Sequence, residues 1–135
     1  MTQEDKELLL KDLCTRLPYV VKCTTKSMWN GIYTIVGYKD NRFFLDCTIY
    51  NEGDDEWMIE SIVPYLRPMS SMTKEERNEY LSIKMQETER VALAEVYRPE
   101  AISEIIDWLN KHHFDYCGLI EKGLALKAPE GIYLY

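Results

Sequence analysis

The residues best suited to chemistry lie in one short segment near the C-terminal end of the chain. His112 and His113 are the only histidines, and Asp115 and Cys117 follow them in the string H-H-x-D-x-C. Imidazole, thiolate and carboxylate groups are ligands that transition metals prefer, and a cysteine close to a histidine resembles an activated nucleophile. One interpretation is therefore a small hydrolase or metal-dependent enzyme that uses His112, His113 and Cys117.

The surrounding sequence favours a structural explanation of the same string. It spans a helix end and a turn, a second pair of metal ligands is missing, and no residue is identifiable as the group that would orient a catalytic histidine. Histidines at a helix C-terminus are ordinary, because the partial negative charge of the carbonyls there favours imidazolium. The chain also lacks a phosphate-binding glycine loop, a G-x-S-x-G elbow and an H-E-x-x-H motif. We therefore expect a protein that is not an enzyme, with no cofactor and no metal.

The other notable feature of the sequence is an acidic sector between Arg42 and Arg67, an interval with no basic residue. The acidic residues of this interval are Asp46, Glu52, Asp54, Asp55, Glu56 and Glu60. A solvated turn is the ordinary explanation of such a run, and the order of residues does not match an EF-hand. The other interpretation is a surface for a cation or for a partner with basic character.

The chain that positions these residues has 135 residues and a formal net charge of −7, and 46% of it is hydrophobic. This length suits a single domain, residues 1–135, with its own core. The negative charge disfavours nucleic acid and anionic membranes as partners. No stretch approaches the roughly 18 apolar residues of a membrane span, and the N-terminus does not resemble a signal peptide. We expect a cytoplasmic protein.

The four cysteines are expected to be free thiols. Cys14, Cys23, Cys47 and Cys117 are far apart in the sequence and form no C-x-x-C pair. This spacing predicts neither a zinc knuckle nor a thioredoxin-type motif.

Residues 1–72 predict a helix followed by a small antiparallel sheet. Thr2 can cap the helix with Asp5 three residues on, and Pro18 ends it. From residue 19 to residue 62 the hydrophobic period is two, and turn-rich connections at residues 39–42 and 51–55 separate the strands. The pattern favours a meander of about four strands, with a curled SH3-type barrel as an alternative. Pro64 and Pro68 are expected to end the strands, with a helical turn between them.

Residues 73–135 predict two or three helices and a closing hairpin, so the fold class is α+β. Thr73 and Glu76 have the spacing of a capping box, which starts a helix of open extent between residues 86 and 97. Its apolar stripe consists of Leu81, Met85, Thr88 and Ala92. A second helix begins at Pro99, and Asp115 caps a short turn through residue 120. The strands of the closing hairpin are expected at residues 124–126 and 132–134.

The order of helix, turn, short helix and hairpin in this half is also the order of a winged helix, which raises the alternative of a nucleic-acid-binding regulator. The recognition segment would be residues 115–122. It offers one basic residue and two acidic ones, whereas groove binding needs lysine and arginine to neutralise phosphates. The composition of the segment therefore disfavours DNA.

Four stretches of the chain resemble a family of small uncharacterised proteins from gut anaerobes and their prophages. The stretches are LLLKDLCTRLPY, PYLRPMSSMT, DWLNKHHFDYCGLI and GLALKAPEG. The resemblance implies a prophage or mobile-element setting, where small acidic proteins often bind other proteins. It implies no substrate, and the function we expect is a non-enzymatic protein-interaction or regulatory module.

The partner is expected at the junction formed by residues 64–72, which combines an arginine, an aromatic residue and methionines. Arginine and tyrosine are common interface anchors, and methionine adapts to varied partners. The predicted partner-binding residues are Tyr65, Arg67, Met69, Asp54 and Asp55. The alternative is that this apolar segment packs against its own chain.

Overall fold

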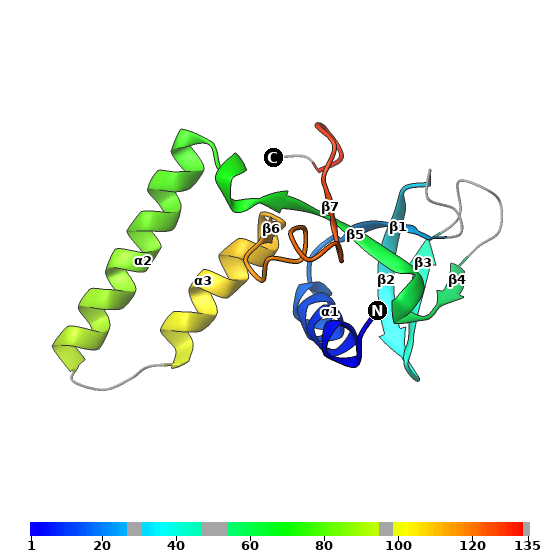
Figure 1. Cartoon of the computed structure of the whole chain (residues 1–135). Helices are drawn as coiled ribbons and strands as arrows, with labels where there is room; N and C mark the ends of the chain where they lie inside the picture. Colours follow the sequence, from blue (N-terminus) through cyan, green and yellow to red (C-terminus); the bar gives the residue numbers. More distant parts are fainter. Residues whose placement is uncertain (27–30, 47–53, 95–98, 134–135) are drawn as a thin grey trace.

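The computed structural model describes residues 1–26, 31–46, 54–94 and 99–133, and for residues 54–57, 87–94 and 99–103 it describes the backbone alone. The fold is α+β, as predicted, with an N-terminal helix, a mixed sheet and two further helices (Figure 1). The helices are α1 (Gln3–Arg16), α2 (Lys74–Ala94) and α3 (Pro99–Lys111), with 3-10 turns η2 (Ile59–Ser61) and η3 (Met69–Ser71). The strands are β1 (Lys22–Thr25), β2 (Tyr33–Lys39), β3 (Arg42–Asp46), β4 (Asp54–Trp57), β5 (Ile62–Pro68), β6 (Phe114–Asp115) and β7 (Leu126–Lys127).

Helix α1 covers the sheet, as its apolar face predicts. The Thr2 hydroxyl accepts a hydrogen bond of 3.1 Å from the Asp5 N–H, which confirms the predicted cap. Leu9 and Leu13 are fully buried and pack in the main hydrophobic core. The other buried members of this core are Val21, Cys23, Tyr33, Ile35, Phe43, Leu45, Ile62, Leu66, Leu119, Leu124 and Ala125. The core therefore joins the N-terminal helix, the strands and the segment that follows β6.

The predicted meander is present, since β1 pairs with β2, β2 with β3 and β3 with β4, each in antiparallel fashion. Asp40 and Asn41, which connect β2 to β3, have φ values of 53° and 64°, the conformation of a tight hairpin turn. Strand β5 follows η2 and pairs with the other edge of β1, so the order is β4-β3-β2-β1-β5. No pairing joins β4 to β5 among the described residues, and closure of this sheet into an SH3-type barrel stays a prediction.

Strand β5 runs through both prolines, contrary to the expectation that they end the strand. The Arg67 N–H donates to the His113 carbonyl at 2.8 Å. Because N–H groups of successive strand residues face opposite edges, Pro64 and Pro68 face the edge away from this bond. Neither proline therefore interrupts the pairing of β5 with β1 and β6, and no helical turn forms between them.

The expected closing hairpin is not formed in the described residues. Strand β7 pairs with β5 in parallel fashion, with Tyr65 opposite Leu126, and β6 pairs in parallel with the last residues of β5. The chain then returns so that the Tyr133 hydroxyl accepts from the Lys22 N–H at 2.8 Å and donates to the Tyr65 carbonyl at 2.7 Å. Tyr133 thus links its segment to β1 and β5. The strand that pairs with β7 is β5, and not residues 132–134 as the hairpin prediction requires.

Helices α2 and α3 lie side by side and extend away from the sheet (Figure 1). Their contact, together with β6, forms a second hydrophobic cluster built on Trp108, Leu109 and Phe114. Tyr80 and Ile83 of α2 pack against this cluster, and the Tyr80 ring lies 5.7 Å from the Trp108 ring. The two helices are therefore held by aromatic packing at the end that meets the sheet.

Residues 115–122 form β6 and a series of turns, and no regular helix is present there. The Asp115 carboxylate accepts hydrogen bonds of 2.9 Å from the N–H groups of both Leu119 and Ile120, which confirms it as the cap of this turn. The recognition helix that a winged helix requires is absent from this described segment. The segment packs inward through Leu119, which is fully buried.

Candidate interaction surfaces

A buried ion pair organises the place where the sheet meets the helices. The Arg67 guanidinium, at the end of β5, donates to both carboxylate oxygens of Glu76 at 2.7 and 2.6 Å, and to the His112 carbonyl at 3.2 Å. It also lies 4.2 Å from the centroid of the Phe114 ring. Hydrogen bonds from Arg67 are the main reason that the pKa of Glu76 is lowered from 4.5 to about 2. Both groups are therefore charged at neutral pH and face each other.

Glu76 also completes the predicted capping box. Its N–H donates to the Thr73 hydroxyl at 3.1 Å, and its carboxylate accepts from the Thr73 N–H at 2.9 Å. One carboxylate thus starts α2 and anchors it to β5.

The predicted partner-binding residues are mostly enclosed by their own chain. Tyr65 is 9% exposed and Arg67 is 6% exposed, and Met69 is half-buried against the second cluster. Asp54 and Asp55 lie on β4, where the structure describes the backbone alone. Packing within the chain accounts for Tyr65 and Arg67, and a partner-binding role for this set stays a prediction without a described surface.

The histidines and Cys117 do not converge. The His112 ring packs at a tilt against Trp108, with ring centroids 4.4 Å apart, and its Nδ1 lies 3.5 Å from Glu76. The His113 ring instead stacks on Tyr133, with ring centroids 3.6 Å apart. Burial is the main cause that lowers the pKa of His113 to about 4, with the charges of Arg16 and Arg67 adding to it. His113 is therefore neutral at physiological pH and packs as an aromatic ring.

Cys117 lacks the properties of a nucleophile. Burial, followed by the nearby Asp12 carboxylate, raises the pKa of its thiol to about 11. The described cysteines Cys14, Cys23 and Cys117 are not in disulfides, and Cys47 lies outside the described residues. The residues of the H-H-x-D-x-C string point to different parts of the fold, and Asp115 is used as a cap.

Over the residues that the structure describes, no group of three or more histidine, cysteine, aspartate or glutamate side chains is placed to hold a metal ion. Within the same residues, none of the helices combines the length and the apolar character that a membrane span requires.

A second buried ion pair lies within α1, and its arginine joins this helix to the segment after α3. Arg16 bonds to Asp12 one turn earlier in α1, and its Nη2 donates to the Phe114 carbonyl at 2.7 Å. Tyr116 lies under the guanidinium and donates to the Asn110 side chain at 2.8 Å. These contacts fix β6 against α1 and have a structural role.

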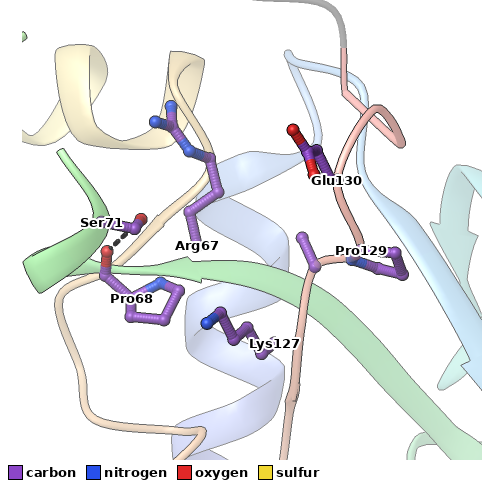
Figure 2. Close-up of a pocket in the computed structure, with 7 residues that line it drawn as sticks. Arg67, Pro68, Ser71, Lys127, Pro129 and Glu130 are labelled. Carbon is purple, nitrogen blue, oxygen red and sulfur yellow. Dashed lines mark hydrogen bonds between the residues drawn. The ribbon is translucent and has the colours of Figure 1, made fainter. Parts of the chain in front are cut away.

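A groove of about 440 Å³ lies between the end of β5 and the segment that follows β7. It is lined by Arg67, Pro68, Ser71, Lys127, Ala128, Pro129 and Glu130. Figure 2 shows Pro68 and Ser71 on one side, Lys127, Pro129 and Glu130 on the other, and the Arg67 guanidinium pointing away from Lys127. The stretches PYLRPMSSMT and GLALKAPEG, far apart in sequence, therefore meet here. The groove offers two proline rings, the Lys127 ammonium and the Glu130 carboxylate.

Among the helical side chains that the structure describes, the most exposed apolar pair lies on the outward face of α2. Leu81 is 45% exposed and Met85 is 63% exposed, one turn apart. These two residues belong to the predicted apolar stripe of the helix, whereas Tyr80 and Ile83 are the residues of α2 that pack against the second hydrophobic cluster. The side chains of Thr88 and Ala92 lie outside the described ones. Figure 1 shows α2 at the edge of the molecule, with α3 on one side of it.

The sequence contains a signal that distinguishes the two stripes. Tyr80 and Ile83 are three residues apart and continue the row that starts at Glu76, while Leu81 and Met85 are four residues apart, so α2 has two stripes with apolar members. Only the first begins at the capping-box carboxylate that Arg67 binds. The anchored stripe is the one that faces the core.

A scan of protein-family models, a search of curated proteins and a search of solved structures each give no match to the chain.

Proposed function

We propose that the protein is a non-enzymatic interaction module that binds another protein through the outward face of α2. The observation that carries the proposal is the exposure of Leu81 and Met85 on a long helix at the edge of the fold. Exposed apolar residues at helical spacing can bind the apolar face of a partner. The same residues contribute little to the cores of this chain.

The chemistry of the described residues supports a binding role over catalysis. His112 packs on Trp108, His113 stacks on Tyr133, and the Cys117 thiol is held in its protonated form. A hydrolase would need at least two of these groups within hydrogen-bond reach of each other. The prophage or mobile-element setting and the cytoplasmic location belong to the same proposal, and both rest on the sequence.

The test compares proteins captured from an extract of the source organism by the wild-type protein and by a Leu81→Glu/Met85→Glu variant. We expect a specific set of captured proteins to be lost with the variant, because two carboxylates on the stripe prevent apolar contact with a partner. The matched control is Val36→Glu, which changes a side chain of β2 that is 52% exposed. The control should retain the captured set.

Circular dichroism and thermal unfolding of all three proteins establish that they are folded. The proposal fails if the folded Leu81→Glu/Met85→Glu variant captures the same proteins as wild type, or if the Val36→Glu control loses them equally.

A further inference from the structure

The apolar pair on α2 has basic residues along one flank. At roughly 100° per residue, an arc of about 120° of the helix surface contains both apolar residues and their polar neighbours. The residues of this arc, which we call the α2 outer face, are Lys74, Arg77, Asn78, Leu81, Lys84 and Met85, and all six are exposed. The three charged members are all basic.

The acidic residues of the same part of the helix lie elsewhere. Glu76 faces the core and binds Arg67, and Glu75 and Glu79 fall outside the arc. The chain as a whole has a net charge of −7, so the α2 outer face is a local basic and apolar surface on an acidic protein. Charge of this sign next to apolar side chains selects a partner of the opposite sign.

We infer that the partner which binds the α2 outer face is an amphipathic helix with an apolar stripe flanked by glutamate or aspartate. The inference rests on the proposed function and names the chemistry of its partner. Leu81 and Met85 form a ridge that fits between the side chains of a second helix. Lys74 and Arg77 then lie beside the stripe, where acidic flanking residues of the partner can reach them. Lys84 already has an interaction within its own chain.

Two other anionic partners fit this surface less well. Duplex DNA offers phosphates but leaves Leu81 and Met85 without apolar contact, and the rest of the protein repels it. An anionic membrane accepts an amphipathic helix, but stable binding needs more buried apolar area than two side chains provide. An acidic helix satisfies both the apolar and the basic residues of the face.

The test uses two synthetic helical peptides of about 20 residues with identical leucine stripes, one flanked by glutamate and the other by lysine. Fluorescence anisotropy measures the binding of each peptide to the full protein. We expect the acidic peptide to bind about tenfold more tightly than the basic one in low salt, with the ratio falling as salt screens the charges.

Charge reversal on the protein gives the decisive comparison. The Lys74→Glu/Arg77→Glu variant should reverse the preference for the acidic peptide, while Glu75→Lys, at an exposed position outside the arc, should leave the preference in place. The Leu81→Ser/Met85→Ser variant should weaken the acidic peptide severalfold, since apolar contact is lost. Vesicles of phosphatidylglycerol and phosphatidylcholine, and random duplex DNA, serve as competing anionic surfaces.

The inference is overturned if neither peptide binds, if the basic peptide binds as tightly as the acidic one, or if vesicles or DNA bind more tightly than the acidic peptide. These outcomes do not contradict the proposed function if Leu81 and Met85 are still required to capture proteins from the extract of the source organism. If capture does not depend on Leu81 and Met85, the proposed function itself is wrong.

Discussion

Arg67 and Glu76 join the sheet to the helices through two contacts of 2.7 and 2.6 Å, made at the end of β5 and in the first turn of α2. The pair also connects to the capping box through the Thr73 N–H and to α3 through the His112 carbonyl. Three elements therefore depend on one carboxylate. Because the pair is buried, loss of either partner leaves an uncompensated charge.

Glu76→Gln should destabilise the fold by about 3 kcal/mol, because the Arg67 guanidinium then remains buried without a counter-charge. Urea unfolding at pH 7 measures the effect. The neighbouring Glu75→Gln is the matched control, since Glu75 is exposed and its change should alter stability by less than about 0.5 kcal/mol. Equal unfolding midpoints for Glu76→Gln and wild type would contradict the structural role of the pair.

The same ion pair predicts the acid stability of the protein. The pKa of Glu76 is lowered from 4.5 to about 2, so the unfolded chain takes up this proton more readily than the folded one. The contribution of the pair is complete above pH 4.5 and is lost as the pH falls towards 2. The unfolding free energy of wild type should therefore fall more steeply over this interval than that of Glu76→Gln. If the two proteins gave parallel profiles of unfolding free energy against pH, the ion pair would not be the cause of acid sensitivity.

Thr73→Ala should destabilise by about 1 kcal/mol, through loss of the hydroxyl that accepts from the Glu76 N–H. The carboxylate of Glu76 remains bound to Arg67 in this variant, so the effect should be smaller than that of Glu76→Gln. Ser70→Ala, an exposed serine on the same segment, is the control. A larger loss for Thr73→Ala than for Glu76→Gln would reverse the order that the contacts predict.

His113 should make the protein less stable in mildly acidic solution. Its pKa is lowered to about 4, below the ordinary value of 6.5, because the ring is partly buried on Tyr133 and near two arginines. The unfolded chain binds the proton first, so the stability contributed by neutral His113 is present above pH 6.5 and is lost as the pH falls through 4.

His113→Asn is the informative variant for this effect, because the backbone at this position has a φ of 66°, which asparagine tolerates. Unfolding free energies at several pH values between 7 and 4 should decline less for the variant than for wild type. His113→Val should be much less stable than His113→Asn at neutral pH, since a β-branched residue is strained at this φ.

Much of the fold follows from local sequence signals. Thr2 and Thr73 begin helices as predicted, because a cap depends only on residues three positions apart. The meander also follows, since alternation of period two and the Asp40-Asn41 turn are local features. These parts required no knowledge of which distant segments meet.

The remainder depends on contacts between distant segments. Leu126 pairs with Tyr65 across 61 positions of sequence, and no local pattern distinguishes this parallel pair from a closing hairpin. The burial of Arg67 has the same origin, because the arginine matches an interface anchor in sequence until Glu76 and Phe114 are placed around it. The choice between the two stripes of α2 likewise required the position of α3.

Cys117 should react slowly with iodoacetamide in the native protein, because its thiol has a pKa of about 11 and little thiolate forms at neutral pH. Mass spectrometry after timed alkylation at pH 7.5 gives the rate, with glutathione, whose thiol is unperturbed, as the reference. Under denaturing, non-reducing conditions all four cysteines should be alkylated. Faster alkylation of Cys117 than of glutathione would revive the nucleophile hypothesis.

Truncation of Ile83 should destabilise the protein more than truncation of Leu81, although the two residues are only two positions apart on α2. Ile83 packs against the Trp108 cluster, so Ile83→Ala should destabilise by about 1 to 2 kcal/mol, less than a fully buried side chain because it is only half-buried. Leu81 is 45% exposed, so Leu81→Ala should change stability by less than about 0.5 kcal/mol. Urea unfolding of the two variants determines which stripe faces α3. If Leu81→Ala were the more destabilising change, the helix would be rotated relative to this structure, and the α2 outer face would no longer be available to a partner.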